Sequence, residues 1–245
     1  MKKILLLLFV MLSLIYTPRV NASTESATSY VLLDQDTNRV LLSKNKDKPM
    51  LIASITKIMT CIIALENKNI SDLVVVDDSI KESYGSGIYI SVGEEITLKD
   101  LLYGLMLRSG NDAAIMISTY VSGSVDSFVD LMNQKAKEIG MKNTVFHNPS
   151  GLDNNTIGNT STAYDMALLT KYAMNSPVYQ EIVKTKTYKV TTNKKTYLWH
   201  NKNKLLKYDY ITGGKTGYTE ESGRTLVSTA NIDNMSLIVV TIRDS

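Results

Sequence analysis

The stretch Ala53-Ser-Ile-Thr-Lys-Ile-Met-Thr60 carries both a structural and a chemical pattern. From Ser54 onward the apolar residues fall at the spacing i, i+3, i+4, i+7, i+8, which predicts a helix with one buried stripe: Ile55, Ile58, Met59, Ile62 and Ile63. Ser54 and Lys57 are three residues apart, so they share a face of that helix. A hydroxyl beside an amine on one face is the arrangement of a nucleophile with its base.

Two further short motifs follow in order, Ser109-Gly-Asn111 and Lys215-Thr-Gly217. Each motif alone has an ordinary structural interpretation: an N-cap serine with a solvated lysine, a turn, and a glycine bulge. The ordered set, with steps of 55 and 106 residues, is hard to obtain by chance. The combination S-x-x-K, S-x-N and K-T-G is known from penicillin-binding proteins and class A β-lactamases.

The flanking residues narrow the resemblance. Ala53–Thr60, Arg108–Ala114, Asn148–Leu152 and Gly214–Thr219 resemble segments of the D-alanyl-D-alanine carboxypeptidases, the low-molecular-mass penicillin-binding proteins, and the similarity runs from about Ser29 to the C-terminus. The resemblance implies an α+β fold of the β-lactamase/transpeptidase type. It also implies removal of the terminal D-alanine from peptidoglycan stem peptides through an acyl-enzyme on Ser54, acylation by β-lactams, and no metal or other cofactor.

The order of predicted elements is strands, helices and then strands. Tyr30–Asp34 and Arg39–Ser43 flank a polar turn and predict a β-hairpin. Helices are predicted over 97–108, 112–121, 124–139 and 161–175, and extended segments over 187–191, 196–200, 210–216, 224–230 and 235–242. We therefore expect one antiparallel sheet built from the first hairpin and the last strands, with an inserted helical part at about residues 70–175.

Lys57 can serve as the base only if its pKa is lowered, by burial or by a second cation, for which Lys215 is the candidate. Free backbone N–H groups at the helix N-terminus can donate to a developing oxyanion. The resemblance assigns this oxyanion hole to the backbone N–H groups of Ser54 and Tyr218. It assigns to Ser109 a proton transfer between Lys57, Lys215 and the leaving amine.

The remaining motif residues are expected to hold the substrate. Asn111 would donate its side-chain amide to a substrate carbonyl. Lys215 and Thr216 would hold a free terminal carboxylate, and Gly217 would let the ligand approach the strand edge as an added strand. The segment 201–206 resembles a family segment at the site, and either Lys202 or Asn203 contacts ligand there or the segment is a solvated loop.

The first 22 residues predict a secretory signal peptide: Lys2 and Lys3, an apolar run over 4–15, and small residues at 20–22. Twelve residues are fewer than the roughly 20 that span a bilayer, which disfavours an uncleaved anchor. We expect residues 23–245 to form one penicillin-binding-type domain outside the cytoplasm. Without the leader, Lys and Arg equal Asp and Glu at 24 each, so nothing indicates nucleic-acid binding. Cys61 is the only cysteine, and a small core residue is the favoured interpretation.

Four alternatives are weighed against this interpretation. A Ser-His-Asp hydrolase would have only His147 and His200 available, and the sequence has no G-x-S-x-G motif. A zinc carboxypeptidase is disfavoured because the sequence has no H-E-x-x-H motif. A class A β-lactamase would need a deacylating glutamate after the middle motif, and no glutamate lies between Glu138 and Glu181. A catalytically silent cell-wall binding protein of the same fold is the fourth.

The sequence departs from the usual pattern of this family at its C-terminus. Family members usually continue into a covering helix, a small β-domain and often an amphipathic membrane anchor, whereas this sequence stops at Ser245. We expect either that the chain is a fragment, in which case membrane-surface association would depend on a segment beyond it, or that one face of the sheet is less covered than usual.

Overall fold

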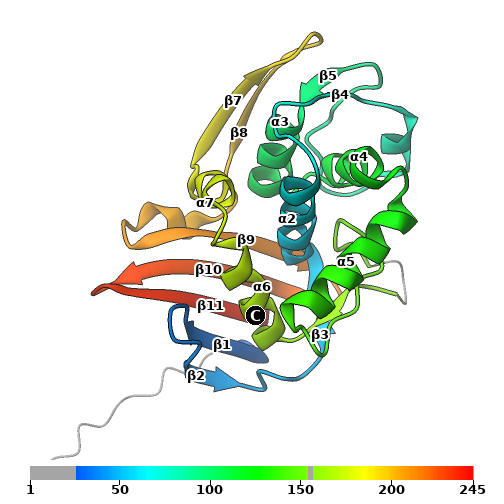
Figure 1. The fold of residues 1–245 in the computed structure, drawn as a ribbon. Coiled ribbons are helices and arrows are strands. Elements are labelled where there is room, and N and C mark those ends of the chain that lie inside the picture. The colour runs from blue at the N-terminus through cyan, green and yellow to red at the C-terminus, as the bar shows by residue number, and fades with distance from the viewer. Residues whose placement is uncertain (1–25, 154–156, 245) are drawn as a thin grey trace, which may run out of the picture.

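A five-stranded antiparallel sheet lies at the base of the molecule, with strand order β2-β1-β11-β10-β9 (Figure 1). The computed structural model describes residues 26–153 and 157–244, so the predicted signal peptide lies outside the described residues. The first hairpin and the last three strands share this sheet, as the sequence predicts. The strands are β1 (Ser29–Asp34), β2 (Val40–Lys44), β9 (Ile211–Thr219), β10 (Gly223–Ile232) and β11 (Met235–Asp244).

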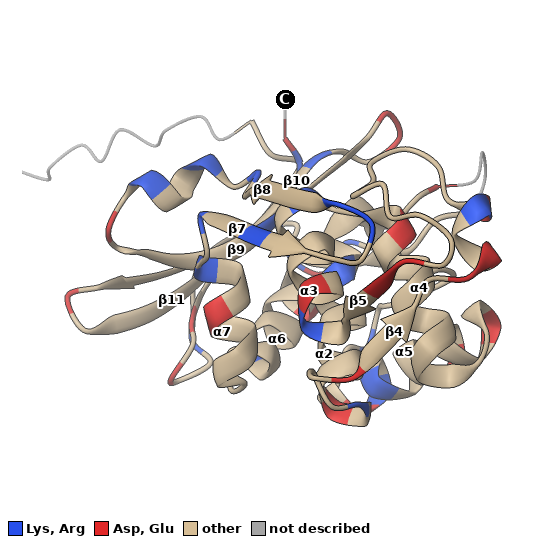
Figure 2. Ribbon diagram, turned by 90° about the horizontal axis from the view of Figure 1, so that it is seen from above, with Lys and Arg blue, Asp and Glu red and all other residues tan. Residues whose placement is uncertain are grey.

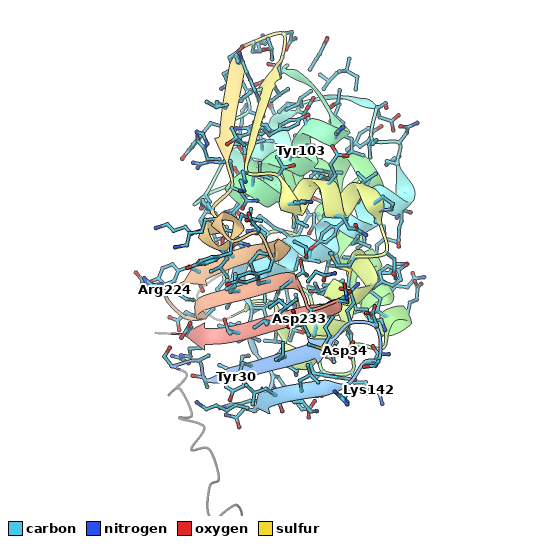
Figure 3. All side chains as sticks on the ribbon, turned by 90° about the vertical axis from the view of Figure 1, so that its left-hand side faces the viewer. Tyr30, Asp34, Tyr103, Lys142, Arg224 and Asp233 are labelled. Atoms are coloured by element: carbon cyan, nitrogen blue, oxygen red, sulfur yellow. The ribbon has the colours of Figure 1, made fainter. Side chains whose placement is uncertain are left out.

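Helices cover one face of the sheet. Along β1, Ser29, Val31 and Leu33 are buried, while the alternate residues are only half-buried. Helix α6 (Ala163–Ala173) packs on β1 and β11, and α7 (Pro177–Lys184), which the sequence analysis did not predict, packs on β9. The other face is more open, since Leu42 on β2 remains 48% exposed. In Figure 3, Tyr30 and Asp34 mark the sheet, and Tyr103 lies well above them among the helices.

Helix α2 (Lys57–Asn67) runs through the centre of the helical part. It contacts helices on several sides, so every residue from Lys57 to Ala64 is buried. The prediction of a single buried stripe was therefore wrong. Cys61 is a core residue, as predicted, and burial raises the pKa of its thiol. The helices around α2 are α3 (Leu98–Tyr103), the π-helical turn η3 (Gly104–Arg108), α4 (Asn111–Ser122) and α5 (Val125–Ile139).

The predicted helix ends agree well with the structure. Thr97 caps α3 by accepting a hydrogen bond from the Asp100 N–H, and Ser124 caps α5. Gly140 ends α5 in the left-handed conformation, φ 88°. The predicted helix over 97–108 is α-helical only to Tyr103 and then widens into the π turn that leads to Ser109.

Two predicted strands lie outside the main sheet. Among the residues that the structure describes, strands β7 (Thr187–Thr191) and β8 (Thr196–His200) pair with each other and with no other strand, and Thr187 lies opposite His200. Their inward aromatic residues bind this hairpin to the helical part, because the Tyr188 ring stacks on Tyr103 at 3.7 Å between centroids. The short elements that complete the fold are β3 (Met50–Leu51), η1 (Ala53–Thr56), β4 (Leu73–Val75), η2 (Asp78–Glu82), β5 (Glu95–Thr97), β6 (Thr160–Ser161) and η4 (Lys204–Lys207).

The charge distribution is uneven around this hairpin. Between Ile182 and Tyr208 the chain has eight lysines and no aspartate or glutamate, and several of these lysines appear as blue segments around β7 and β8 in Figure 2. Lys202, toward the end of this stretch, lines the same cavity as Ser54 and Ser109. In the part of the chain that the structure describes, no helix has the length and apolarity needed to cross a bilayer.

Candidate active site

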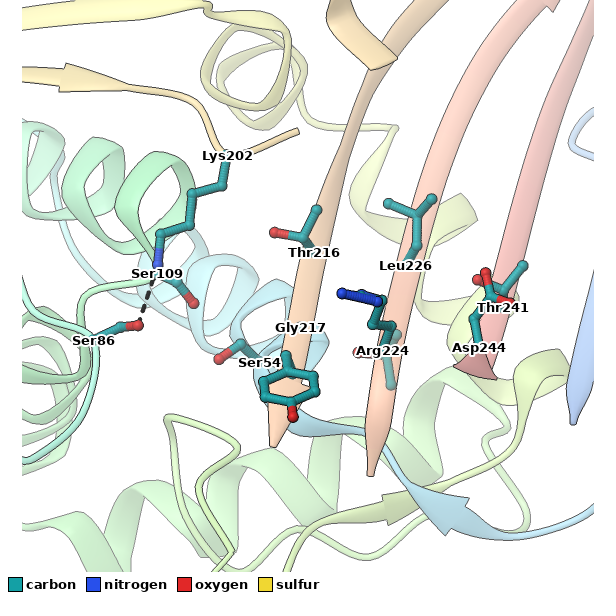
Figure 4. A pocket seen from close by; sticks show the side chains of 12 residues that line it. Ser54, Ser86, Ser109, Lys202, Thr216, Gly217, Arg224, Leu226, Thr241 and Asp244 are labelled. Carbon is teal, nitrogen blue, oxygen red and sulfur yellow. Dashed lines mark hydrogen bonds between the residues drawn. The ribbon is translucent and has the colours of Figure 1, made fainter. Parts of the chain in front are cut away.

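A cavity of about 470 Å³ opens where the edge strand β9 meets the helical part (Figure 4). It is lined by residues of all three motifs or their neighbours, together with residues of β10 and β11. Motif segments that are far apart in sequence therefore meet at one surface. The lining residues that matter below are Ser54, Ser86, Ser109, Lys202, Thr216, Gly217, Tyr218 and Arg224.

Ser54 lies on a short 3₁₀ turn, η1, that comes before helix α2. The expectation that Ser54 begins the α-helix was wrong by one turn, because α2 starts at Lys57. Ala53 has a left-handed backbone, φ 47°, at the approach to this turn. The Ser54 hydroxyl faces the cavity and lies 3.2 Å from the Lys57 Nζ. The serine and lysine thus face each other, as their spacing predicts.

Lys57 is completely buried, and its amine has three polar neighbours. Its Nζ is 2.7 Å from Asn111 Oδ1, 2.6 Å from the Ser150 carbonyl oxygen and 3.2 Å from Ser54 Oγ. The first two neighbours are acceptors only. A neutral amine has two N–H donors and one lone pair, so both donors are taken and the lone pair is left for the Ser54 hydroxyl. The geometry therefore fits Lys57 as a neutral base.

The surroundings of Lys57 favour that neutral form. Burial lowers the pKa of Lys57 well below its usual 10.5, and the positive charges of Lys215 and Lys202 lower it further. The second cation that the sequence analysis assigned to Lys215 thus acts on Lys57, with burial as the larger cause. Asp112, a nearby carboxylate, acts weakly in the opposite direction.

Ser109 and Lys215 form the second pair. Ser109 follows the π turn with a left-handed backbone, φ 63°, which turns its side chain into the cavity. Lys215 Nζ donates to Ser109 Oγ at 3.0 Å and to the Thr216 carbonyl at 2.6 Å. Lys215 is 2% exposed, and burial, assisted by the Lys202 charge, lowers its pKa to about 7. The amine of Lys215 is therefore directed at Ser109 and lies below the cavity surface, and its contact with a substrate carboxylate stays a prediction.

Asn111 begins helix α4 and is fixed at both ends of its amide. Its Oδ1 accepts from Lys57, and its Nδ2 donates to the Tyr84 carbonyl at 2.6 Å. An amide nitrogen carries two hydrogens. The N–H that Tyr84 accepts orients the amide oxygen toward the base, and donation of the second N–H to a substrate carbonyl stays a prediction.

Gly217 allows β9 to approach the nucleophile. A Cβ at this position would lie 2.4 Å from Thr225 Oγ1 and 2.9 Å from the Ser54 nitrogen, so no side chain fits between β9 and η1. Close approach of a ligand at Gly217 stays a prediction, and the close approach of the Ser54 turn is a second reason for the glycine. Thr216 and Tyr218 line the cavity on the same strand, and the Tyr218 side chain is 64% exposed.

Several residues at the site carry no sequence signal. The carbonyls of Ser150 and Tyr84 act through the backbone. The Asp112 carboxylate accepts from the N–H groups of Ile88, Tyr89 and Ala113, which fixes the loop that carries Ser86.

The structure separates the two candidate residues of the segment 201–206, while contact with a ligand stays a prediction. Lys202 reaches the cavity and donates to Ser86 Oγ at 3.1 Å. Asn203 is buried, caps η4 and contacts the Gly213 carbonyl, so it is structural. His200 contacts Thr187 on the exposed hairpin, and His147 lies at a different surface depression from Ser54. Within residues 26–153 and 157–244, no group of three or more His, Cys, Asp or Glu side chains is placed to hold a metal ion.

Comparison with known proteins agrees with this geometry. The family model described as D-alanyl-D-alanine carboxypeptidase matches residues 17–245. The D-alanyl-D-alanine carboxypeptidase DacF of Bacillus subtilis is 40% identical over 233 residues, which cover 91% of this chain and 58% of that protein. A D-alanyl-D-alanine endopeptidase of Escherichia coli is 31% identical over 249 residues, covering 95% of this chain and 79% of the relative.

Solved structures show the same fold. A D-alanyl-D-alanine carboxypeptidase from Mycobacterium tuberculosis superposes with a TM-score of 0.88 at 29% identity, covering 94% of this chain and 87% of the other. A mutant of a Streptomyces DD-transpeptidase gives 0.86 at 30% identity, covering 91% and 92%. The chain spans somewhat more than half the length of several curated relatives, 58% for those from Bacillus subtilis and Escherichia coli named DacF and DacC. With the family model matched over almost the whole chain, this protein belongs to the D-alanyl-D-alanine carboxypeptidase family.

Proposed function

We propose that the protein is a serine-type D-Ala-D-Ala carboxypeptidase that removes the terminal D-alanine from peptidoglycan stem peptides. The observation that carries the proposal is the environment of Lys57. Asn111 Oδ1 and the Ser150 carbonyl accept from the Lys57 amine, and Ser54 Oγ lies 3.2 Å from the same Nζ. In the neutral amine the lone pair is then left for the Ser54 hydroxyl proton. General-base assistance of this kind contributes about 10²–10⁴-fold to a rate.

The acylation step follows from this geometry. Lys57 takes the Ser54 proton while Oγ attacks the carbonyl carbon of the penultimate D-alanine. The backbone N–H groups of Ser54 and Tyr218 stabilise the oxyanion. When the C–N bond breaks, Ser109 passes a proton to the leaving amine and recovers one from Lys215, whose Nζ is 3.0 Å from its hydroxyl. A free D-alanine leaves and an ester on Ser54 remains.

The proton on Lys57 then returns through Ser109 to Lys215, which restores the neutral base. Water attacks the Ser54 ester and gives a proton to Lys57, which passes it to Ser54 Oγ as the ester C–O bond breaks and the shortened peptide leaves. The chain has no glutamate between Glu138 and Glu181 that could activate this water as in class A β-lactamases. A β-lactam, whose leaving group stays attached, should therefore acylate Ser54 and remain bound. The substrate lies in the cell wall, so the proposal includes export through the predicted signal peptide at residues 1–22.

Release of D-alanine from a diacyl-Lys-D-Ala-D-Ala peptide by the purified protein tests the proposal. We expect release that EDTA does not inhibit. Ser54→Ala should abolish both release and labelling by a fluorescent penicillin, and Lys57→Ala should reduce both by at least the range given for a general base. A folded protein that takes up penicillin but releases no D-alanine would contradict the carboxypeptidase assignment, and cleavage of cross-linked peptides alone would indicate an endopeptidase. A protein that does neither would be the silent binding protein.

A further inference from the structure

We propose that the exposed lysines on and beside the β7–β8 hairpin bind a linear phosphodiester polymer of the polyol phosphate type. Apart from Lys202, this surface lies outside the candidate active site, and the proposal does not depend on the proposed function. In Figure 1 the hairpin stands beside the helical part, with its turn directed away from the main sheet. We call the eight lysines between Ile182 and Tyr208 the basic cluster: Lys184, Lys186, Lys189, Lys194, Lys195, Lys202, Lys204 and Lys207.

The positive charge of the basic cluster is concentrated and not neutralised by acidic side chains. All eight lysines are exposed, and the stretch between Ile182 and Tyr208 has no aspartate or glutamate. Across the described residues, none of the eight forms an ion pair. Because basic and acidic residues balance in the chain without its leader, this excess is a local feature of the surface. A surface with one sign of charge attracts a ligand of the opposite sign.

The strand pattern explains why the lysines face solvent. Lys189 lies at an exposed position of β7 that alternates with half-buried apolar and aromatic residues, and Trp199 is among the buried residues of β8. Lys186 comes directly before β7, and Lys194 lies in the turn. Positive charge therefore marks the base, the middle and the tip of the hairpin. At about 3.3 Å per residue, a strand of the length of β7 extends over roughly 17 Å.

The residue type and the spacing of the basic cluster both favour a phosphodiester chain. The stretch between Ile182 and Tyr208 contains no arginine. The planar fork of arginine matches a carboxylate in a two-point contact, whereas the lysine ammonium binds phosphate as a point charge. Charges spread over roughly 17 Å extend beyond one small anion and fit several successive charges of a chain. A polymer with one negative charge per phosphodiester meets both requirements.

The hairpin lacks the features that a membrane or a nucleic acid would need. Membrane-surface binding uses apolar side chains that enter the headgroup region, and single-stranded nucleic acids stack their bases on exposed aromatic rings. The aromatic side chains of the hairpin face the helical part, and Trp199 is only 4% exposed. Leu198 lies on the outer face, which otherwise presents threonine, lysine and histidine. Nearby, the exposed Tyr208 ring is stacked on Tyr210 and lies under the Lys207 ammonium, so charge is the property that this surface presents.

Binding of a fluorescently labelled poly(glycerol phosphate) to the whole protein, followed by anisotropy, tests the proposal. We expect saturable binding whose Kd rises about tenfold or more between about 50 and 200 mM salt, because each contact releases a counterion. Changing three hairpin lysines to glutamine should raise the Kd about tenfold, since each exposed charge contact contributes modestly: Lys186→Gln, Lys189→Gln and Lys194→Gln. These lysines do not line the cavity of Ser54, so release of D-alanine from a soluble peptide should stay unchanged.

A matched variant controls for net charge. It changes three exposed lysines on other parts of the surface and should bind the polymer within about twofold of the unaltered protein: Lys48→Gln, Lys137→Gln and Lys142→Gln. Both triple variants should keep the urea midpoint of the unaltered protein, because substitutions of exposed side chains have small effects on stability. An equal loss of binding in the two variants would show attraction by net charge alone and would overturn the proposal.

Three other ligands decide the class of partner: vesicles that contain phosphatidylglycerol, single-stranded DNA, and the carboxylate polymer polygalacturonate. The proposal requires poly(glycerol phosphate) to bind most tightly at the same salt and charge concentration. Tighter binding of any of the three would overturn it. The Ser54→Ala protein should bind poly(glycerol phosphate) like the unaltered chain. A failure to release D-alanine therefore refutes the proposed function alone, and an absence of polymer binding refutes this proposal alone.

Discussion

Replacing Lys215 with Met should stabilise the protein while it removes activity. Lys215 is almost fully buried, and its pKa is lowered to about 7 from the usual 10.5. The unfolded chain therefore binds more protons than the folded protein between these pH values, so a rise in pH through this window stabilises the unaltered protein. Met has a similar shape and titrates in neither state, which removes this dependence.

The size of the effect follows from the two pKa values. With a folded pKa of about 7, linkage gives a cost of about 4 kcal/mol at pH 7 and about 2 kcal/mol at pH 9 for keeping Lys215 buried. The variant loses the hydrogen bonds to Ser109 and Thr216, which offsets about 1–2 kcal/mol of the gain. We therefore expect Lys215→Met to be about 2–3 kcal/mol more stable at pH 7 and nearly equal at pH 9.

Urea unfolding at pH 7, 8 and 9 measures this difference, since the midpoint and slope give the free energy of unfolding. The useful quantity is the gap between variant and unaltered protein, because groups other than Lys57 titrate alike in both. Removing the Lys215 charge raises the pKa of Lys57, which can only widen the gap at pH 7 relative to pH 9. The gap should shrink by about 2 kcal/mol over this range. A gap that does not change with pH would refute the argument that burial of Lys215 sets its pKa, even if the variant were more stable.

Further predictions concern the neighbours of this group. The rate of acylation by penicillin should rise with pH as Lys57 deprotonates, with a midpoint well below 10.5. Lys202→Gln should move this midpoint to higher pH, because the Lys202 charge lowers the pKa of both Lys57 and Lys215. An unchanged midpoint would count against this coupling. Gly217→Ala should greatly slow acylation, because a Cβ would press on Ser54 and Thr225, while the circular dichroism spectrum stays that of the folded protein. Full activity would mean that β9 and η1 can move apart freely. Asp112→Asn should cost about 2–3 kcal/mol in thermal unfolding, because an amide nitrogen would face backbone N–H donors; a loss below about 0.5 kcal/mol would show that the 84–90 loop is held by other contacts.

Much of the fold was predictable because its signals are local. The Thr97 and Ser124 caps, the Gly140 stop and the polar turn between the first two strands depend on residues close together in the sequence. Both strands of the β7–β8 hairpin were predicted, but their separation from the main sheet was not, because strand pairing depends on which part of the fold the apolar face packs against. Tyr188 finds Tyr103 in the helical part and not another strand of the sheet. The complete burial of α2 depends on packing from several sides in the same way.

The motif residues of the site were predictable, but their orientation was not. Seven of the motif residues lie at or directly beneath one cavity, and Asn111 lines the neighbouring depression and joins the site through its contact with Lys57; the seven are Ser54, Lys57, Ser109, Lys215, Thr216, Gly217 and Tyr218. The carbonyls of Ser150 and Tyr84 could not be found, because every residue has a carbonyl and only the fold brings one to Lys57 or Asn111. The position of Arg224 in the cavity wall could not be predicted either, because this residue lies on β10 outside the motifs and reaches the cavity through the register with β9.

The central claim is that Ser54 is the acylated nucleophile and Lys57 is its neutral base. Mass spectrometry of the protein after incubation with benzylpenicillin, followed by peptide mapping, tests it most directly. We predict one added penicilloyl group per chain, located on the peptide that contains Ser54, absent in Ser54→Ala and formed much more slowly in Lys57→Ala. An adduct on another residue, or labelling of Lys57→Ala at the rate of the unaltered protein, would contradict the account.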